Sequence, residues 1–531
     1  MRDWMNLGHA GVLLHAYDDL YPHNDKTYSQ LWESLKSHDS SRVNHTPVVT
    51  QLMRSDTWLY GFMDPPERIQ VITSQGFYTI PVAKKRLMGE QELWDTYHGV
   101  SGSEHSEASL AQLDLHSVVK ELDTINLKYN DPVDWNKPIP EQYNIPHEEF
   151  KWSLDDEIEK LESKSDKSSS EITHLQKLKD CRDTNDRAMF FFPVNYLEHD
   201  RYLKGDHTNF PFFQSVVEPT RRRSHIHHLM RNYAKFMRQA GYNYWVFSGN
   251  AISWYFNGNN MPWDEDIDIR MTVQEMNRMS LTHNATLVVE NPEEGDGLYY
   301  FTISPWFGGF TRTGNHIDSR FVDIKTGLYI DITCLYEVSE SKEEILQRDA
   351  IFDSWGIKKE YREEYLSNHA VINDKNNNWY WEDNFSRNFR TLFEGTMTYM
   401  PYEFAKVLVY NYGRDVLTRR DFDSWNYYPE TGMWVNGRLC EPKKYQKVFD
   451  YGEAFNSDGK LTLKGACDRD ALLDEWTRTH ISIDMHKEEL DLFTIGDKGH
   501  LKYSEKDLPI YWSDEFTDIF NYYETSGDSS I

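Results

Sequence analysis

The sequence is poor in long hydrophobic runs and in positive charge. No stretch of its 531 residues reaches the roughly 20 apolar residues of a membrane-spanning helix, and residues 1–19 lack the pattern of a signal peptide. We therefore expect a soluble chain, attached to a membrane only through a segment absent from this sequence. The formal net charge of −29 argues against a nucleic-acid partner, because binding to nucleic-acid phosphates requires basic stripes on the protein.

Cysteine is also scarce. The chain has four cysteines, which lie far apart and never form a Cys-x-x-Cys pair, so a structural zinc site is not expected. They are Cys181, Cys334, Cys440 and Cys467. Two disulfides in any of three pairings are open, and so are four free thiols in a reducing compartment. The composition therefore leaves the compartment undecided.

The remaining composition is that of a globular protein. Hydrophobic residues make up 39% of the chain and aromatic residues 15%, which is enough for sizeable cores, and the length predicts about two to four domains. We predict an accessory region of unknown role at residues 1–215 and a central domain at 216–430. A C-terminal extension at 431–531 is expected to pack on the central domain. Within the first region, residues 154–180 read as two exposed helices around a flexible break, or as a partly disordered segment.

Asp264, Asp266 and Asp268 recur at every second residue, and an isoleucine follows each of the last two. Successive side chains of a β-strand point to opposite faces, so on a strand these carboxylates would share one face while the isoleucines enter a core. A cluster of like charges needs a positive partner, and for an all-oxygen cluster that partner is usually Mg²⁺ or Mn²⁺. The spacing therefore predicts a metal site. A solvated acidic turn after Pro262 is the alternative.

The segments around this motif predict the elements that would hold it. Apolar residues at 226–237 recur at helical spacing and predict a helix. Residues 244–247 read as a strand, which leads into the turn Ser248-Gly249-Asn250. Residues 321–333 read as a β-hairpin, in which Asp331 lies between two core isoleucines.

A Ser-Gly turn, an Asp-x-Asp strand and a third acid on a later strand are the layout of a nucleotidyltransferase-like mixed sheet with flanking helices. We therefore predict an α/β (α+β) fold. In this layout Gly249 lets the backbone approach a phosphate closely, and Ser248 and Asn250 can donate hydrogen bonds to it. Arg320 and Lys325 lie in the predicted hairpin and could neutralise a diphosphate, with ordinary surface charge as the alternative.

The carboxylates would supply the chemistry of such a site. Asp266 and Asp268 would hold one or two divalent ions that bridge phosphates, and Asp331 would be a further ligand or the base for an attacking hydroxyl. Phosphoryl transfer needs mainly positioning and charge neutralisation from the protein, so these few groups are sufficient.

Three segments resemble the LicD-type phosphotransferases, in the order of that family. They are residues 249–271 (GNAISWYFNGNNMPWDEDIDIRM), 318–333 (DSRFVDIKTGLYIDIT) and 390–413 (RTLFEGTMTYMPYEFAKVLVYNYG). The resemblance covers roughly residues 220–415 and is greatest to the fungal mannosylphosphate transferase branch. Fukutin-like and bacterial phosphocholine transferases are more distant. The chain departs from the family at Asn250-Ala251, where relatives usually have a small hydroxyl residue and an aliphatic one.

The resemblance implies roles for individual residues. Asp266 and Asp268 become metal ligands for Mn²⁺ or Mg²⁺, Asp331 becomes the third acid of the site, and Asp264 supports them. The resemblance also implies an activity: transfer of mannose-1-phosphate from GDP-mannose to a mannose hydroxyl of a glycan in the Golgi lumen, with release of GMP. Two alternatives stay open, namely a CDP donor of phosphocholine or ribitol phosphate, and a non-catalytic regulator of glycan phosphorylation.

Overall fold

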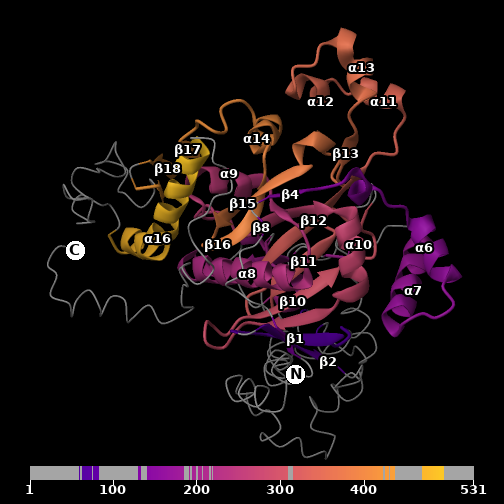
Figure 1. The fold of residues 1–531 in the computed structure, drawn as a ribbon. Helices are drawn as coiled ribbons and strands as arrows, with labels where there is room; N and C mark the ends of the chain where they lie inside the picture. The colour runs from indigo at the N-terminus through magenta and orange to yellow at the C-terminus, as the bar shows by residue number, and fades with distance from the viewer. Residues whose placement is uncertain are drawn as a thin grey trace, which may run out of the picture.

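The computed structural model describes residues 63–82, 130–132, 140–183, 190–308, 315–436 and 469–494, apart from short gaps inside these ranges, together with Ser55 and Leu59. A mixed sheet of 11 strands forms the centre of this part of the chain (Figure 1). Its main path, in spatial order, is β14 (Trp379–Trp381), β13 (Val371–Asn373), β12 (Tyr329–Glu337), β11 (Ser319–Asp323), β10 (Leu298–Ile303), β9 (Thr286–Val289), β1 (Arg68–Thr73), β2 (Gly76–Pro81) and β3 (Asn130–Pro132).

Two further strands extend this sheet beside β12. β8 (Ile267–Thr272) pairs in parallel with β12, and β7 (Trp245–Val246) pairs antiparallel with β8. β1 and β9 also pair in parallel, whereas the other neighbours are antiparallel. The predicted mixed α/β fold is thereby confirmed.

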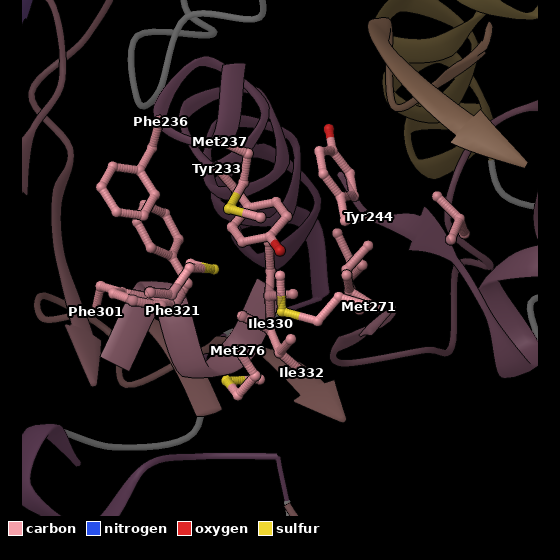
Figure 2. Packing of buried hydrophobic residues seen from close by; sticks show 14 of the residues in the cluster. Tyr233, Phe236, Met237, Tyr244, Met271, Met276, Phe301, Phe321, Ile330 and Ile332 are labelled. Atoms are coloured by element: carbon pink, nitrogen blue, oxygen red, sulfur yellow. The ribbon is translucent and has the colours of Figure 1, made fainter. Parts of the chain in front are cut away.

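The long helix α8 (Pro219–Ala240) packs one face on the sheet. Figure 2 shows Tyr233, Phe236 and Met237 of α8 against Phe301 of β10 and Phe321 of β11. All five side chains are fully buried, and each such burial stabilises the fold by roughly 1.5–3 kcal/mol. The helix stops where Gly241 adopts a positive φ of 74°. The apolar spacing at 226–237 therefore predicted both the helix and its buried face.

Smaller sheets and helices surround the central sheet. The smaller sheets are β16 (Thr396–Pro401), β15 (Arg387–Phe393) and β4 (Gln142–Asn144); β17 (Asp421–Phe422), β18 (Trp425–Tyr428) and β19 (Met433–Asn436); and β5 (Val194–Glu198) with β6 (Arg201–Gly205). The other helices are α6 (Leu154–Ser163), α7 (Ser169–Asp183), α9 (Ser248–Asn257), α10 (Val273–Thr282), α11 (Lys342–Leu346), α12 (Asp349–Ser354), α13 (Arg362–Leu366), α14 (Phe404–Tyr412) and α16 (Arg469–Thr494), with 3₁₀ turns η4 (His147–Phe150), η5 (Phe210–Phe212), η6 (Lys359–Tyr361) and η7 (Glu382–Asn384).

Strands from both sides of residue 215 share sheets. β1, which lies in the region predicted to be separate, pairs in parallel with β9, and β4 pairs with β15. The proposed boundary at 215 therefore does not separate two sheets in the described structure. Such pairings join segments that are far apart in the sequence, so no local pattern marks them.

The C-terminal helix α16 packs on the end of α9. Nε2 of His486 lies 2.5 Å from the carbonyl oxygen of Trp254, and Ser482 donates a 2.9 Å hydrogen bond to the side chain of Asn259. Between these contacts, Gly258 ends α9 with a φ of 74°, and a Cβ there would lie 2.6 Å from Cγ of His486. Glycine is thus needed for both the backbone conformation and the close approach.

None of the helices in the described part of the chain combines the length and apolar character needed to cross a membrane. Of the cysteines, Cys181 and Cys334 are free thiols, and Cys334 is buried. Cys440 and Cys467 lie outside the described residues.

Candidate active site

The sheet brings Asp268 and Asp331 side by side. Asp268 of β8 pairs with Asp331 of β12 in the parallel register, and Asp331 faces Arg320 of β11 in the antiparallel register. The isoleucines that flank the two aspartates are fully buried in the main core on the opposite face. The predicted alternation of carboxylate and core residue therefore holds on both strands.

Asp264 and Asp266 lie near Asp268 but outside β8. β8 begins only at Ile267, so these two residues lie in the segment before it, where the N–H of Asp264 donates to the carbonyl of Met261 at 2.9 Å. The prediction of one strand through all three aspartates is thus corrected, and β8 carries Asp268 alone. The turn after Met261 prevents strand geometry, and an asparagine side chain takes up the backbone groups that a strand would pair.

Burial and proximity both act against ionisation of these carboxyls. Burial, together with the charges of Asp266 and Asp268, raises the pKa of Asp264 to about 8. Burial, together with the charges of Asp266 and Asp331, raises the pKa of Asp268 to about 7. Burial also raises the pKa of Asp331, against the opposing effect of Arg320. The four aspartates therefore form one electrostatic cluster, hereafter the carboxylate cluster.

Two side-chain cations partly neutralise the carboxylate cluster. Nε of Arg320 donates a 2.7 Å hydrogen bond to Oδ1 of Asp331, and its guanidinium lies 3.7 Å from the centre of the Tyr329 ring. Nδ1 of His207 lies 2.9 Å from Oδ2 of Asp266. Burial alone would lower the pKa of His207, but Asp266 outweighs it and raises that pKa to about 9. Sequence reasoning predicted Arg320 here but missed His207, since no motif surrounds this histidine.

The donor set suits a hard divalent cation, because it consists of carboxylate oxygens alone. In the described part of the chain, however, no group of three or more His, Cys, Asp or Glu side chains is already arranged so that it could hold a metal ion. Arg320 and His207 each contact a carboxylate oxygen that a metal would otherwise use. A metal ion that bound through either of these two oxygens would have to displace the ion pair there, whereas Asp264 and Asp268 have no such partner among the described residues.

The predicted Ser-Gly turn forms the first turn of α9, next to the carboxylate cluster. Ser248 has a positive φ of 56°, and its Oγ lies 2.7 Å from the hydroxyl of Tyr412. A hydrogen bond from Ser248 also acts to lower the pKa of Asp268, against the stronger effect of burial. A Cβ at Gly249 would lie 3.6 Å from Oδ2 of Asp264, so this backbone lies close to the acids. The N-terminal end of a helix favours negative charge, which suits both carboxylate and phosphate.

Asn250 holds the aspartate segment in place. Its side-chain oxygen accepts a 2.6 Å hydrogen bond from the N–H of Asp268, and its Nδ2 donates to Oδ1 of Asn260 at 2.7 Å and to the carbonyl of Asp266 at 3.2 Å. The side chain is only 1% exposed. These contacts give Asn250 a positioning role; its predicted contact with a phosphate stays a prediction.

Lys325 lies apart from the other predicted phosphate-binding residues. It sits in the turn between β11 and β12, where its Nζ lies 2.5 Å from a carboxylate oxygen of Asp296. Both side chains are exposed, so the alternative of ordinary surface charge describes this position well.

Replacing Asn250 with Ala should destabilise the protein by about 1–3 kcal/mol, because the buried N–H of Asp268 loses its side-chain acceptor. Thermal or chemical unfolding measures this loss. Asn368→Ala is the matched control, since Asn368 is an exposed asparagine that also donates to a carbonyl, and we expect almost no change there. Equal stability of the Asn250→Ala variant and the parent would contradict the positioning role.

Glu394 is a further buried acid that the sequence did not mark. It lies in the tight turn between β15 and β16 with a φ of 51°, and Oε1 accepts a 2.5 Å hydrogen bond from the N–H of Asn260. Burial raises the pKa of its carboxyl to about 7. Because Asn260 also binds the carbonyl of Asp266, Glu394 supports the aspartate segment from behind.

The raised pKa of Glu394 predicts that the stability of the protein depends on pH. This pKa rises from 4.5 to about 7 on folding, so the contribution of Glu394 to stability declines as pH rises through this interval. We expect the stability of Glu394→Gln, relative to the parent, to improve by about 2–3 kcal/mol between about pH 5 and pH 8. Unfolding curves at several pH values measure this difference. Glu363→Gln, at an exposed position, should show no such trend, and a flat difference for Glu394→Gln would refute the effect.

Residues 241–373 match the family described as LicD/FKTN/FKRP, nucleotidyltransferase domain. The chain carries a LicD domain. The matched segment contains the carboxylate cluster and Arg320, whereas His207, Glu394 and Tyr412 lie outside it.

Two curated proteins of Saccharomyces cerevisiae are similar to this chain. Mannosyltransferase regulator 4 is 29% identical over 210 residues, and mannosyltransferase regulator 14 is 27% identical over 219 residues. The alignments cover 37% and 39% of this chain, but only 18% and 23% of the two relatives. The LicD domain and these matches confirm the predicted resemblance to the LicD family and its fungal branch.

Proposed function

We propose that the chain transfers mannose-1-phosphate from GDP-mannose to a mannose hydroxyl of a glycan, in the Golgi lumen and with a divalent metal ion. The LicD domain and the names of the two relatives support the coarser statement, a role in glycan phosphate transfer or in its regulation. One observation carries the catalytic form of the proposal. Asp268 and Asp331 lie side by side on paired strands, with Asp264, Asp266 and the first turn of α9 around them.

In the proposed reaction, the acceptor hydroxyl oxygen bonds to the phosphorus that carries mannose. The bond from that phosphorus to the bridging oxygen breaks, and GMP leaves with that oxygen. Asp331 accepts the hydroxyl proton, and Arg320 beside it offsets negative charge on the phosphates. Mn²⁺ or Mg²⁺ bound by Asp266 and Asp268 would neutralise phosphate oxygens.

A non-catalytic regulator is the second candidate, and two observations favour it. Both relatives bear the name regulator, and Arg320 and His207 already neutralise part of the carboxylate cluster without a metal. Unrelieved repulsion in the cluster would call for a metal ion, and these cations reduce that repulsion. A CDP donor of phosphocholine or ribitol phosphate is a third candidate, which the same carboxylates would serve.

Nucleotide release tests the proposal. The purified chain is incubated with Mn²⁺, a mannose oligosaccharide and, in separate reactions, GDP-mannose, CDP-choline or CDP-ribitol. We expect GMP from GDP-mannose, together with an oligosaccharide heavier by one mannose phosphate. Release of CMP instead would change the donor and keep the site. No product from any donor, with protein that is folded, would favour the regulator.

A further inference from the structure

Three aromatic side chains, one exposed and two half-buried, pack together next to Asp264 of the carboxylate cluster. They are Trp263, Phe422 and Trp425, hereafter the aromatic platform. The rings of Trp263 and Phe422 are stacked, with centroids 5.4 Å apart and 17° between their planes. The ring of Trp425 lies 5.2 Å from Trp263 at 42°.

The aromatic platform has a firm base. Trp434, which is buried, meets Trp263 edge to face at 5.1 Å. The hydroxyl of Tyr427 donates a 2.6 Å hydrogen bond to the carbonyl of Phe256, and Asn257 donates a 2.8 Å bond to the carbonyl of Gly432. β18 and β19 are thereby tied to the end of α9, beside which β17 and β18 lie in Figure 1. A surface held in this way loses little conformational entropy when a ligand binds.

The platform is exposed at Phe422, whereas Trp263 and Trp425 are half-buried. Phe422 is 50% exposed, although one of its faces lies on Trp263. Among the described residues five large hydrophobic side chains are exposed, and one other of these, Tyr412 at 43%, contacts Ser248 of the candidate site. Two of the five therefore flank the carboxylate cluster. Exposed aromatic rings beside polar groups are typical of a binding surface.

The two ends of the carboxylate cluster differ in character. At the Asp331 end lies the buried cation Arg320, which suits the phosphates of a donor. At the other end Trp263 directly precedes Asp264, and the cations of this region are already paired. Arg222 contacts Glu265 and the carbonyl of Pro262, and Arg419 lies 3.7 Å from the carboxylate of Asp421. This end offers aromatic faces and carboxylate acceptors, a combination that suits a neutral molecule with many hydroxyl groups.

The geometry of phosphoryl transfer assigns a ligand to each end. The attacking oxygen and the leaving group lie roughly in line on opposite sides of the phosphorus. If the departing nucleotide is held toward Arg320 and Asp331, the acceptor must approach from the other side of the phosphorus, which assigns it to the Asp264 end of the cluster, next to the aromatic platform.

We propose that Trp263 and Phe422 form the acceptor subsite, a stacking surface for a pyranose ring of a neutral glycan. The C–H face of the sugar covers the exposed ring of Phe422, and Asp264 accepts hydrogen bonds from its hydroxyls. This assignment rests on the proposed function, because it takes a glycan as the acceptor. It adds Phe422 and Trp425, outside the matched LicD segment, to the site.

Binding measurements on Phe422→Ala test the subsite. Calorimetry gives the affinity for mannotetraose and, separately, for GDP-mannose with Mn²⁺. We expect mannotetraose to bind about tenfold more weakly, since one stacking contact is lost, and GDP-mannose to bind as to the parent. Phe422→Trp, which keeps an aromatic face, should restore the affinity. Tyr361→Ala is the matched control, since Tyr361 is a 56% exposed aromatic residue on η6.

The other results overturn the subsite. Parent protein that does not bind mannotetraose, or Phe422→Ala that binds it normally, removes the stacking role. If Phe422→Ala lowered only the affinity for GDP-mannose, the platform would instead stack on the base of the donor. A loss of the same size in Tyr361→Ala would mean that the effect is unspecific. Failure of the proposed function gives a different result. In that case no GMP is released, yet mannotetraose still binds the parent and binds Phe422→Ala more weakly.

Discussion

Asp331→Asn should reduce turnover at least ~100-fold, the scale of losing a positioned acid–base group. Asn has the size of Asp, and its side-chain oxygen can still accept the hydrogen bond from Nε of Arg320. The pairing of β12 with β8 and β11 uses backbone groups, which the substitution leaves in place. The variant should therefore fold, while it loses the negative charge that takes the acceptor proton.

The measurement compares the rate of nucleoside monophosphate release by the variant and the parent, with unfolding curves to establish that both are folded. Asp296→Asn is the matched control, because Asp296 is an exposed aspartate next to the same hairpin and should leave the rate unchanged. A folded Asp331→Asn protein with near-normal turnover would remove Asp331 from the catalytic set. Arg320 would then be the group to test next.

Local periodicity in the sequence predicted two strands and one helix around the candidate site. Alternation of isoleucine and aspartate marked β8 and β12, and a three- and four-residue apolar repeat marked α8. Gly327, with a φ of 81°, marked the turn of the hairpin. In each of these elements core side chains recur at the spacing of the element with polar or charged side chains between them, so the sequence pattern follows the structure directly.

Sequence patterns did not predict contacts between residues that are far apart in the chain. His207 reaches Asp266 from a segment that has no motif, and Glu394 reaches Asn260 from a turn 134 residues further along the chain. The stacking of Phe422 on Trp263 likewise joins two segments that sequence patterns treat separately. The predicted start of β8 was wrong for a local reason. A turn at residues 261–264 and the side chain of Asn260 take the backbone groups of this segment, although the Asp-x-Asp spacing continues through it.

Arg320 and His207 change which carboxyls of the cluster lack a positive partner. The sequence predicted a metal ion as the neutralising partner of these acids, with a solvated acidic turn as the alternative. In the structure Asp331 and Asp266 each have a cationic partner, whereas burial and mutual repulsion dominate at Asp264 and Asp268. The unrelieved repulsion is thus concentrated on two of the four carboxyls. A cation bound at Asp266 and Asp268 should therefore stabilise the protein by relieving repulsion at Asp268, which no side-chain cation of the described residues contacts.

Mn²⁺ or Mg²⁺ should raise the stability of the parent by up to a few kcal/mol, because a ligand that binds only the folded state stabilises it by mass action. The double variant Asp266→Asn, Asp268→Asn should lose this response. Without metal it should be at least as stable as the parent near pH 8. Burial raises the pKa of Asp268 to about 7, so above that pH the folded parent carries a charge whose burial costs stability. Loss of the contact between Asp266 and His207 offsets part of this gain.

Thermal unfolding with and without each metal ion measures the response. The double variant Asp155→Asn, Asp156→Asn is the control, since it removes two exposed carboxylates from the first turn of α6 and should keep the full metal response. If the parent responds and the Asp266→Asn, Asp268→Asn variant responds equally, the ion binds elsewhere on the chain. If neither responds, the cluster takes up no metal ion under these conditions, and a role that needs no metal, such as regulation, becomes the stronger proposal.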